Sequence, residues 1–242
     1  MTGIDRQHPL PIYYQLKELL REKITTGVWK PGDLLPSERE LSEGYDISRM
    51  TARQALSELV NEGLVYREQG RGTFVAEPKL VQRLSRLTGY TDDMRERALR
   101  PGARVLRLEI VEAPLHVAAK LRIQPGAPVV LLERLRLADG TPMAVEASHL
   151  HFAGMEGLLQ EDFATDSLYN ILTTTYNITP TRAEQQIEAA RCDQHRQGAL
   201  QVEVGAPILH TTRVTFDQRD RPFEYADSVY RGDRYVFHVE LT

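Results

Sequence analysis

Residues 27–75 read GVWKPGDLLPSERELSEGYDISRMTARQALSELVNEGLVYREQGRGTFV, and this stretch decides the fold of the N-terminal part of the chain. Ser37 stands three residues before Glu40, the spacing of a capping box at the start of a short helix. Ser48 is placed to cap the next helix, and Gly63 follows that helix as a left-handed terminating residue. Beyond Gly63, LVYRE and TFVAE are typical of two short strands around QGRG, a glycine-rich turn.

A further helix precedes this stretch. Apolar residues recur at intervals of three and four from Ile12 to Ile24, with Pro11 before them and Gly27 after them. The resulting order is helix, helix-turn-helix and β-hairpin. This order predicts a winged helix-turn-helix domain over residues 1–76, an architecture that places one helix in the major groove of DNA.

The helix after Ser48 has two distinct faces. Its apolar positions share one arc, which must face the core: Ala52, Ala55, Leu56 and Leu59. Arg49 and Arg53 share another arc near the helix start, from where a guanidinium can bond guanine bidentately. Arg71 stands between two glycines at the hairpin tip, where the backbone can approach a groove closely. The alternative is that these arginines form a solvated face paired with acidic side chains.

The charge of the chain does not by itself favour DNA binding. The net charge is −4, and residues 1–77 contain 10 Lys and Arg against 12 Asp and Glu, a net charge of −2. A broadly basic domain is therefore excluded as the source of affinity. If this domain binds DNA, its arginines must be concentrated on one face, and binding must depend strongly on salt.

The remaining composition is that of an ordinary globular protein. The 242 residues suffice for one or two domains with their own cores. No apolar run approaches the ~18 residues of a membrane-spanning helix, and the N-terminus lacks the apolar core of a signal peptide. Cys192 is the single cysteine, and no Cys/His cluster has the spacing of a zinc site. We expect a cytoplasmic protein without a metal or another cofactor.

Residues 77–88 show no clear period and are expected to link the first domain to a second over residues 89–242. From Arg104 onward the strand-like runs are VLRLEIVEA, VVLLERLRLA, MAVEASHL, ILHTTRVTF, FEYADSVY and YVFHVEL. Helical stretches lie between them, near residues 115–122, 154–177 and 193–200. We expect an α+β domain built on an antiparallel sheet.

The second domain contains an internal repeat. The tripeptide GAP at 126–128 recurs at 205–207, Arg134 matches Arg213 at an offset of 79, and Pro142 matches Pro222 at an offset of 80. Each copy has the order helix, turn, strand, tight turn, strand. We expect the two hairpins to pair into one antiparallel sheet with helices on one side.

Two arginines in the first copy form a candidate anion site. In VVLLERLRLA, alternation places Arg134 and Arg136 on one face of a strand. Neighbouring guanidiniums repel each other unless an anion lies between them, and they suit phosphate or carboxylate. The alternative is a solvated face on which both pair with acidic side chains. Glu146 returns nearby after the Asp139-Gly140 turn, and a three-residue bulged loop would place it on the arginine face.

Further polar residues are candidates for the same site. The run DSLY at 166–169 is typical of a helix start, where Ser167 is either a phosphate donor or an ordinary N-cap. Glu224 and Tyr230 fall on the same face of a later strand, and both suit hydrogen bonds to sugar hydroxyls.

The stretch at 27–75 resembles the DNA-binding domain of the GntR family of bacterial repressors. The resemblance implies DNA contacts from the SERE segment, from the start of the reading helix and from the turn of the wing. The implied residues are Arg39, Ser48, Arg49, Thr51, Arg53, Gln69, Gly70 and Arg71. Met50 departs from the family pattern, which commonly has a polar residue there, and it suits an apolar contact to a thymine methyl.

Residues 84–242 resemble the UTRA effector domain of the HutC subfamily, which has a chorismate-lyase-like fold. The strongest pieces are LTGYTDDMRERALRPGARVL, LERLRLADGTPMAVEASHL, DSLYNIL and FEYADSVYRGDRYVF. They are most similar to regulators of N-acetylglucosamine use, which sense amino-sugar 6-phosphates. The implied phosphate contacts are Arg134, Arg136, Ser167, Tyr169 and the backbone at Thr88, Gly89 and Tyr90. The implied sugar contacts are Glu146, Arg182, Glu224 and Tyr230.

These features predict a repressor that binds near-palindromic operator DNA as a homodimer and responds to a small anionic effector. N-acetylglucosamine 6-phosphate and glucosamine 6-phosphate are the expected effectors. Another sugar phosphate, urocanate or a small carboxylate stays open, because the subfamily senses these as well. Two other protein classes fit the sequence less well. A lyase-like enzyme lacks support, since no catalytic residues are recognisable, and the arginine pair argues against a DNA-binding architectural protein without an effector.

Overall fold

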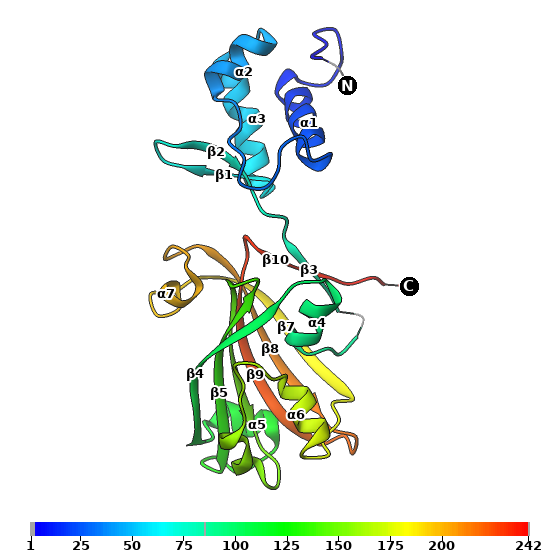
Figure 1. Cartoon of the computed structure of the whole chain (residues 1–242), viewed down its shortest axis with the longest axis vertical. Helices are drawn as coiled ribbons and strands as arrows, with labels where there is room; N and C mark the ends of the chain where they lie inside the picture. The colour runs from blue at the N-terminus through cyan, green and yellow to red at the C-terminus, as the bar shows by residue number, and fades with distance from the viewer. Residues whose placement is uncertain (1–2, 85, 242) are drawn as a thin grey trace. The chain divides into compact units, whose positions relative to one another are not determined.

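The computed structural model describes residues 3–84 and 86–241. The chain forms two compact units, residues 1–79 and 80–242, and each has its own hydrophobic core (Figure 1). The first unit is the predicted winged helix-turn-helix, and the second is the predicted α+β domain with an antiparallel sheet.

The first unit contains three helices followed by a hairpin. Helices α1, α2 and α3 span Ile12–Thr25, Glu38–Tyr45 and Arg49–Asn61, and strands β1 and β2 span Val65–Glu68 and Gly72–Val75. The predicted capping box is present, because Ser37 Oγ accepts from the Glu40 N–H at 3.2 Å and Glu40 Oε2 accepts from the Ser37 N–H at 2.8 Å. The core joins α1, α3 and the hairpin through Leu16, Leu20, Leu56, Leu59, Val65 and Val75.

Two glycines shape the turn of the hairpin. Glu68 pairs with Gly72, so residues 69–71 form a three-residue loop. Gly70 and Gly72 have φ values of 74° and 128°, which side chains rarely adopt. A Cβ on Gly72 would also lie 2.6 Å from Leu34 Cδ1. The two glycines therefore hold Arg71 at the tip of the wing.

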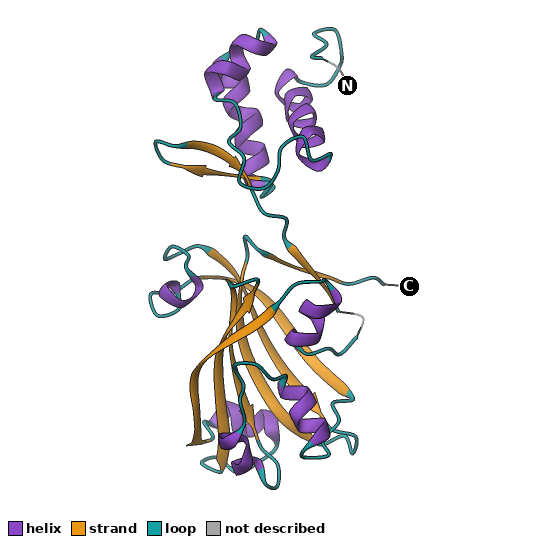
Figure 2. Ribbon diagram, in the orientation of Figure 1, coloured by secondary structure: helices purple, strands orange, loops and turns teal. Residues whose placement is uncertain are grey.

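A six-stranded antiparallel sheet is the frame of the second unit (Figure 2). Its order is β4-β5-β6-β9-β8-β7. The strands span Pro101–Glu112 (β4), Pro128–Ala138 (β5), Thr141–Leu150 (β6), Arg182–Arg191 (β7), Pro207–Phe216 (β8) and Pro222–Arg231 (β9). The helices are α4 (Tyr90–Glu96), α5 (Leu115–Leu121), the 3₁₀ helix η1 (Met155–Gln160), α6 (Leu168–Thr174) and α7 (Gln197–Leu200). A separate parallel pair joins β3 (Leu80–Arg83) to β10 (Tyr235–His238).

The internal repeat is confirmed as two β-α-β-β copies. The elements β4, α5, β5 and β6 form the first copy, and β7, α7, β8 and β9 form the second. The strand order is therefore palindromic about the pair β6 and β9. Equivalent bonds support the match, since the Gly126 N–H donates to Ala113 O at 3.0 Å and the Gly205 N–H donates to Cys192 O at 2.8 Å. The offset of 79 becomes 80 in the hairpin loop, because residues 138–141 separate Leu137 from its partner Pro142, whereas residues 217–221, one residue more, separate Phe216 from its partner Pro222.

The two faces of the sheet carry different helices. Along β5, Val129 packs with α5 and Leu135 packs with α7, whereas Val130 packs with η1 and α6. Side chains alternate between faces along a strand. The helices of the repeat thus share one face, as predicted, and Arg134 and Arg136 point to the other face.

A β-bulge decides where Glu146 points. The turn between β5 and β6 has two residues, 139–140, and not the three-residue loop considered from the sequence. Instead Met143 has no partner on β5, and the register shifts at this point. The extra residue brings Glu146 directly opposite Arg134, on the same face of the sheet. The second hairpin has the equivalent bulge at Phe223.

Three elements of the second unit differ from the sequence prediction. Strand β3 lies inside residues 77–88, which were expected to be an unpatterned linker, and α4 and β7 were not predicted. Leu80 and Gln82 of β3 are buried, whereas Val81 and Arg83 are exposed. The sequence does not show this alternation, because the strand has only four residues and the inward-facing Gln82 is polar. Strand β7 is an edge strand with most of its residues exposed, so it lacks an apolar pattern.

The substitution Leu56→Ala tests the packing of α3. Leu56 is 1% exposed, so its truncation should lower the free energy of unfolding of the first unit by about 2–5 kcal/mol. Trp29 is the only tryptophan and packs against this core, so urea unfolding followed by its fluorescence reports on the unit. The control Met50→Ala truncates a side chain that is 69% exposed and should cost less than about 0.5 kcal/mol. Equal losses in the two variants would contradict the packing.

Candidate functional site

The outward side of α3 and the hairpin turn form one candidate site. Arg49, Met50 and Arg53 are exposed on α3, while the apolar arc of this helix is buried. The other residues predicted to contact DNA lie on α2, at the N-cap of α3 and in the turn of the wing. Apart from the half-buried Thr51, the predicted residues are all exposed: Arg39, Ser48, Arg49, Arg53, Gln69, Gly70 and Arg71.

Acidic side chains pair with arginines on this surface and beside it. Arg53 Nε donates to Glu38 Oε1 at 3.1 Å, Arg67 Nη2 lies 3.5 Å from the same oxygen, and Arg71 pairs with Glu68. Exposed ion pairs of this kind contribute only about 0–1 kcal/mol each. Phosphate or base contacts can therefore replace them at low cost.

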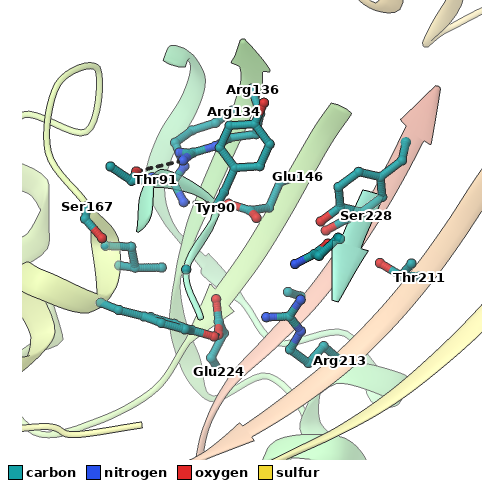
Figure 3. A pocket seen from close by; sticks show the side chains of 16 residues that line it. Tyr90, Thr91, Arg134, Arg136, Glu146, Ser167, Thr211, Arg213, Glu224 and Ser228 are labelled. Atoms are coloured by element: carbon teal, nitrogen blue, oxygen red, sulfur yellow. Dashed lines mark hydrogen bonds and ion pairs between the residues drawn. The ribbon is translucent and has the colours of Figure 1, made fainter. Parts of the chain in front are cut away.

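A polar cavity forms the second candidate site, on the sheet face that carries α6 (Figure 3). Its walls come from β5, β6, β8 and β9, from the starts of α4 and α6, and from β3. The predicted effector residues that line it are Gly89, Tyr90, Arg134, Arg136, Glu146, Ser167, Tyr169, Glu224 and Tyr230. The structure thus brings together nine of the eleven residues that the sequence indicated.

Arg134 and Arg136 form the cationic wall of the cavity, and each is 3% exposed. Arg134 Nη2 donates to Glu146 Oε1 at 2.5 Å, and Arg136 Nη2 donates to Thr91 Oγ1 at 3.1 Å. Among the described residues, Nε and Nη1 of Arg134 and Nε of Arg136 have no hydrogen-bond partner. Buried donors without partners are costly, and two guanidiniums here share one carboxylate. The wall is suited to a further anion.

The charges of this wall shift the pKa values of its groups. Burial and the neighbouring Arg134 lower the pKa of the Arg136 guanidinium to about 10, so it stays protonated at neutral pH. Burial alone would raise the pKa of Glu146, but Arg134 and Arg136 outweigh this effect and hold it below the ordinary value of 4.5. Burial also raises the pKa of Tyr90, whose ring centroid lies 4.5 Å from Arg136 Cζ. At neutral pH the Arg134–Arg136–Glu146 group therefore has a net positive charge.

A second part of the cavity is built around Glu224, which is 3% exposed. Its carboxylate accepts hydrogen bonds from Tyr169 Oη at 2.8 Å, from Thr215 Oγ1 at 2.9 Å and from Ser148 Oγ at 2.8 Å. Burial, together with the negative charge of Glu224, raises the pKa of Tyr169, so this phenol keeps the proton that it donates. Three donors hold the carboxylate in one orientation, and its remaining lone pairs can accept a ligand hydroxyl.

Arg213 also lines the cavity, although it was not among the effector contacts predicted from the sequence. Figure 3 shows that it reaches inward from β8. The sequence feature that could have identified Arg213 is the internal repeat, which matches it to Arg134. Ala226 stands opposite Arg213, where the first copy has Glu146, and Arg213 Nε donates instead to Gln185 Oε1 at 2.7 Å. The other lining residues that were not predicted include Gln82, Thr91, Thr211 and Ser228.

Two predicted effector residues do not line this cavity. Arg182 begins β7 opposite Phe216, and its guanidinium carbon lies 3.7 Å from the centroid of the Phe216 ring. Phe216 packs with α5, so Arg182 lies on the sheet face opposite to the cavity and pairs there with Asp220 at 2.8 Å. Thr88 lies just before the lining residue Gly89 but does not itself line the cavity. The structure therefore corrects the predicted effector role of Arg182, whereas the backbone contact predicted at Thr88 stays a prediction.

Residues 3–84 and 86–241 contain neither a metal-binding cluster nor a membrane-spanning helix. Within these ranges, no three His, Cys, Asp or Glu side chains are grouped so that they could hold a metal ion. None of the helices in the same ranges has the length and apolar character needed to cross a membrane. Cys192 is buried, and burial raises the pKa of its thiol, which disfavours the reactive thiolate.

Comparison with known proteins divides the chain in the same way. Residues 12–75 match the family described as bacterial regulatory proteins, gntR family, and residues 96–236 match the UTRA domain. The HTH-type transcriptional repressor NagR of Bacillus subtilis (strain 168) is 43% identical over 97% of this chain and 96% of its own length. The HTH-type transcriptional regulator GgaR of Escherichia coli (strain K12) is 30% identical over 95% of this chain and 91% of its own. The crystal structure of PhnF from Mycobacterium smegmatis matches with a TM-score of 0.67 and 32% identity, over 93% of this chain and 98% of that one.

The substitution Glu146→Gln tests the electrostatics of the cavity. It leaves two buried guanidiniums without a carboxylate, so the free energy of unfolding of the second unit should fall by about 3–5 kcal/mol at neutral pH. The pKa of Glu146 lies below 4.5 in the folded chain, so its stabilising effect is complete above that pH and is lost as the pH falls through the folded-state value. Urea unfolding followed by circular dichroism over a pH series measures the difference between wild type and variant.

The control for this experiment is Glu109→Gln. Glu109 pairs with Arg107 at 2.7 Å, but its side chain is 49% exposed, so the substitution should change stability by at most about 1 kcal/mol. A Glu146→Gln loss that does not shrink in acid would contradict an ionised Glu146.

Proposed function

Since the chain belongs to the gntR family of bacterial regulatory proteins, as a HutC-type transcription regulator with a UTRA domain, we propose that it is a homodimeric repressor that an amino-sugar 6-phosphate releases from operator DNA. The observation that carries the proposal is the buried pair Arg134 and Arg136, whose unpartnered N–H groups lie in the wall of a polar cavity. N-acetylglucosamine 6-phosphate and glucosamine 6-phosphate are the effectors that we propose.

A phosphate group meets the requirements of the cationic wall. Guanidinium groups bind phosphate oxygens bidentately, and a dianion offsets the excess positive charge of Arg134 and Arg136. Ser167 adds a hydroxyl to the same cavity and makes no capping hydrogen bond with its side chain. Gly89 lies beside it, since a Cβ there would stand 3.7 Å from Ser167 Oγ. The small residue leaves room for phosphate oxygens next to this hydroxyl.

The rest of the cavity suits the hydroxyl groups of a sugar. Glu224 offers acceptor oxygens, Arg213 offers donors, and Tyr230 offers a phenol. Burial raises the pKa of Tyr230 to about 12, so the phenol stays protonated and can donate a hydrogen bond. Acceptors and donors around one polar cavity favour a polyhydroxylated ligand over a simple anion.

The first unit supplies DNA recognition in this proposal. The exposed start of α3 enters the major groove, where Arg49 and Arg53 bond to base edges, and Arg71 in the wing contacts the adjacent groove. A homodimer presents two such helices to a near-palindromic operator in the cytoplasm. Effector binding then favours a dimer geometry that no longer fits both half-sites, because a ligand shifts an equilibrium by its different affinities for the two states.

A thermal-shift screen over amino-sugar phosphates, other sugar phosphates, urocanate and small carboxylates tests the ligand class. We expect stabilisation by N-acetylglucosamine 6-phosphate or glucosamine 6-phosphate, and calorimetry should give an affinity at least about tenfold weaker for Arg134→Met. Arg182→Ala is the control and should bind as tightly as wild type, because Arg182 lies on the opposite face of the sheet. If Arg134→Met also loses DNA binding, Arg134 has a structural role and the proposed site is wrong.

The substitutions Arg49→Ala and Arg53→Ala test DNA reading. Each should weaken binding to a duplex that the wild type has selected from a random pool by about 1–3 kcal/mol, and should relax base preference in that duplex. Fluorescence anisotropy at several salt concentrations measures binding to the selected duplex and to a scrambled duplex. Arg104→Ala removes the same charge from the second unit and serves as the control. An equal loss on both duplexes would show that the two arginines contact phosphate only.

A further inference from the structure

We infer that Gln82 couples occupancy of the cavity to strand β3, and that Tyr235 holds it in position for this role. The inference rests on the proposed function, because it assigns to the same cavity the step by which a bound ligand acts on the rest of the chain. Gln82 is the one residue of β3 that lines the cavity, and it is 6% exposed.

The hydrogen bonding of Gln82 leaves its amide nitrogen for a ligand. Tyr235 Oη donates to Gln82 Oε1 at 2.9 Å, and both side chains are buried. Burial raises the pKa of Tyr235 well above its ordinary value, so the phenol is always the donor in this bond. An amide whose oxygen is engaged presents its two N–H groups as donors, and phosphate or hydroxyl oxygens in the cavity are matching acceptors.

Tyr235 links Gln82 to a second wall of the cavity. It is 1% exposed, and its ring centroid lies 4.6 Å from that of Tyr230, which lines the cavity. Phe237 completes the aromatic cluster at 5.2 Å from Tyr235 and 5.3 Å from Tyr230. A ligand that contacts Tyr230 and Gln82 therefore acts on Tyr235 through both its ring and its hydroxyl.

Strand β3 is suited to respond to such contacts. Among the described strands its one partner is β10, in a parallel sheet of two four-residue strands. A two-stranded sheet has little stability of its own, so this pair depends on the packing of Leu80 and Tyr235 against the core of the second unit, which includes the cavity residue Tyr230. Leu80, the first residue of β3, directly follows Lys79, where the first unit ends. A change in the order of β3 is therefore transmitted along the chain to the segment that leads to the first unit.

Hydrogen exchange on the full-length protein, with and without saturating N-acetylglucosamine 6-phosphate, tests the inference. In the wild type the ligand should slow exchange of the amides of residues 80–84 at least about threefold, because it ties β3 to the cavity. Gln82→Met keeps the approximate size of the side chain and removes the amide. It should bind the ligand at most about tenfold more weakly by calorimetry, since one hydrogen bond is lost, and the ligand should no longer slow β3 exchange.

Two further variants keep the test decisive. Tyr235→Phe removes only the hydroxyl and retains the ring contacts, so it should lose the β3 response even if Gln82→Met folds poorly. Val81→Thr changes a side chain of β3 that is 42% exposed and does not line the cavity, so it should respond as the wild type does.

The outcomes separate the two levels of the proposal. Wild-type binding without slower β3 exchange, or an undiminished response in both Gln82→Met and Tyr235→Phe, overturns the coupling role and leaves the proposed function standing. Absence of wild-type binding overturns the proposed effector and the coupling inference with it. Loss of the exchange response in both variants while they still bind the ligand supports the inference.

Discussion

The second unit depends on how it accommodates two guanidiniums side by side in one strand. Arg134 and Arg136 are almost completely buried, and burial penalises their charge. The bulge at Met143 offsets part of this penalty, because it places the Glu146 carboxylate opposite Arg134. Arg136 donates a hydrogen bond to Thr91 and lies over the ring of Tyr90. These contacts satisfy only some of the donors, and N–H groups of both arginines remain that can donate to the charge-matched acceptor oxygens of an anion.

The repeat explains how such a site arises in an otherwise regular sheet. Both copies carry an arginine at the equivalent strand position, but Ala226 replaces Glu146 in the second copy. The copies also differ in the segments that come after them. Residues 151–181 carry η1 and α6 over one face after the first copy, whereas β10 comes after the second copy. The cavity thus lies where the symmetry of the sheet is broken, between an arginine with its own carboxylate and an arginine without one.

Sequence patterns predicted most of the architecture and the cationic wall of the cavity. A capping box, a glycine turn and a repeated tripeptide each involve a few neighbouring residues, so they can be recognised in the sequence without knowledge of the fold. The position of Glu146 could not be decided, because a single extra residue reverses the face of a strand and Met143 carries no local signal for it. The prediction for Arg182 was wrong for a related reason, since its register against Phe216 sends it to the other face. Arg213 was visible in the repeat, but its role required knowing that β8 and β5 face one cavity.

Both candidate sites contain Arg–Glu ion pairs, but the pairs differ in their exposure to solvent. On the surface formed by α3 and the hairpin turn, Arg53 and Arg71 are largely exposed and pair with Glu38 and Glu68. Salt and water weaken such pairs, so a phosphate group can displace these carboxylates at low cost. In the cavity, Arg134 and Glu146 are shielded from solvent, and screening by salt is weak there. Under the proposed function we therefore expect this negatively charged chain to bind DNA in a salt-dependent manner, and its affinity for a small anion to change less over the same range of ionic strength.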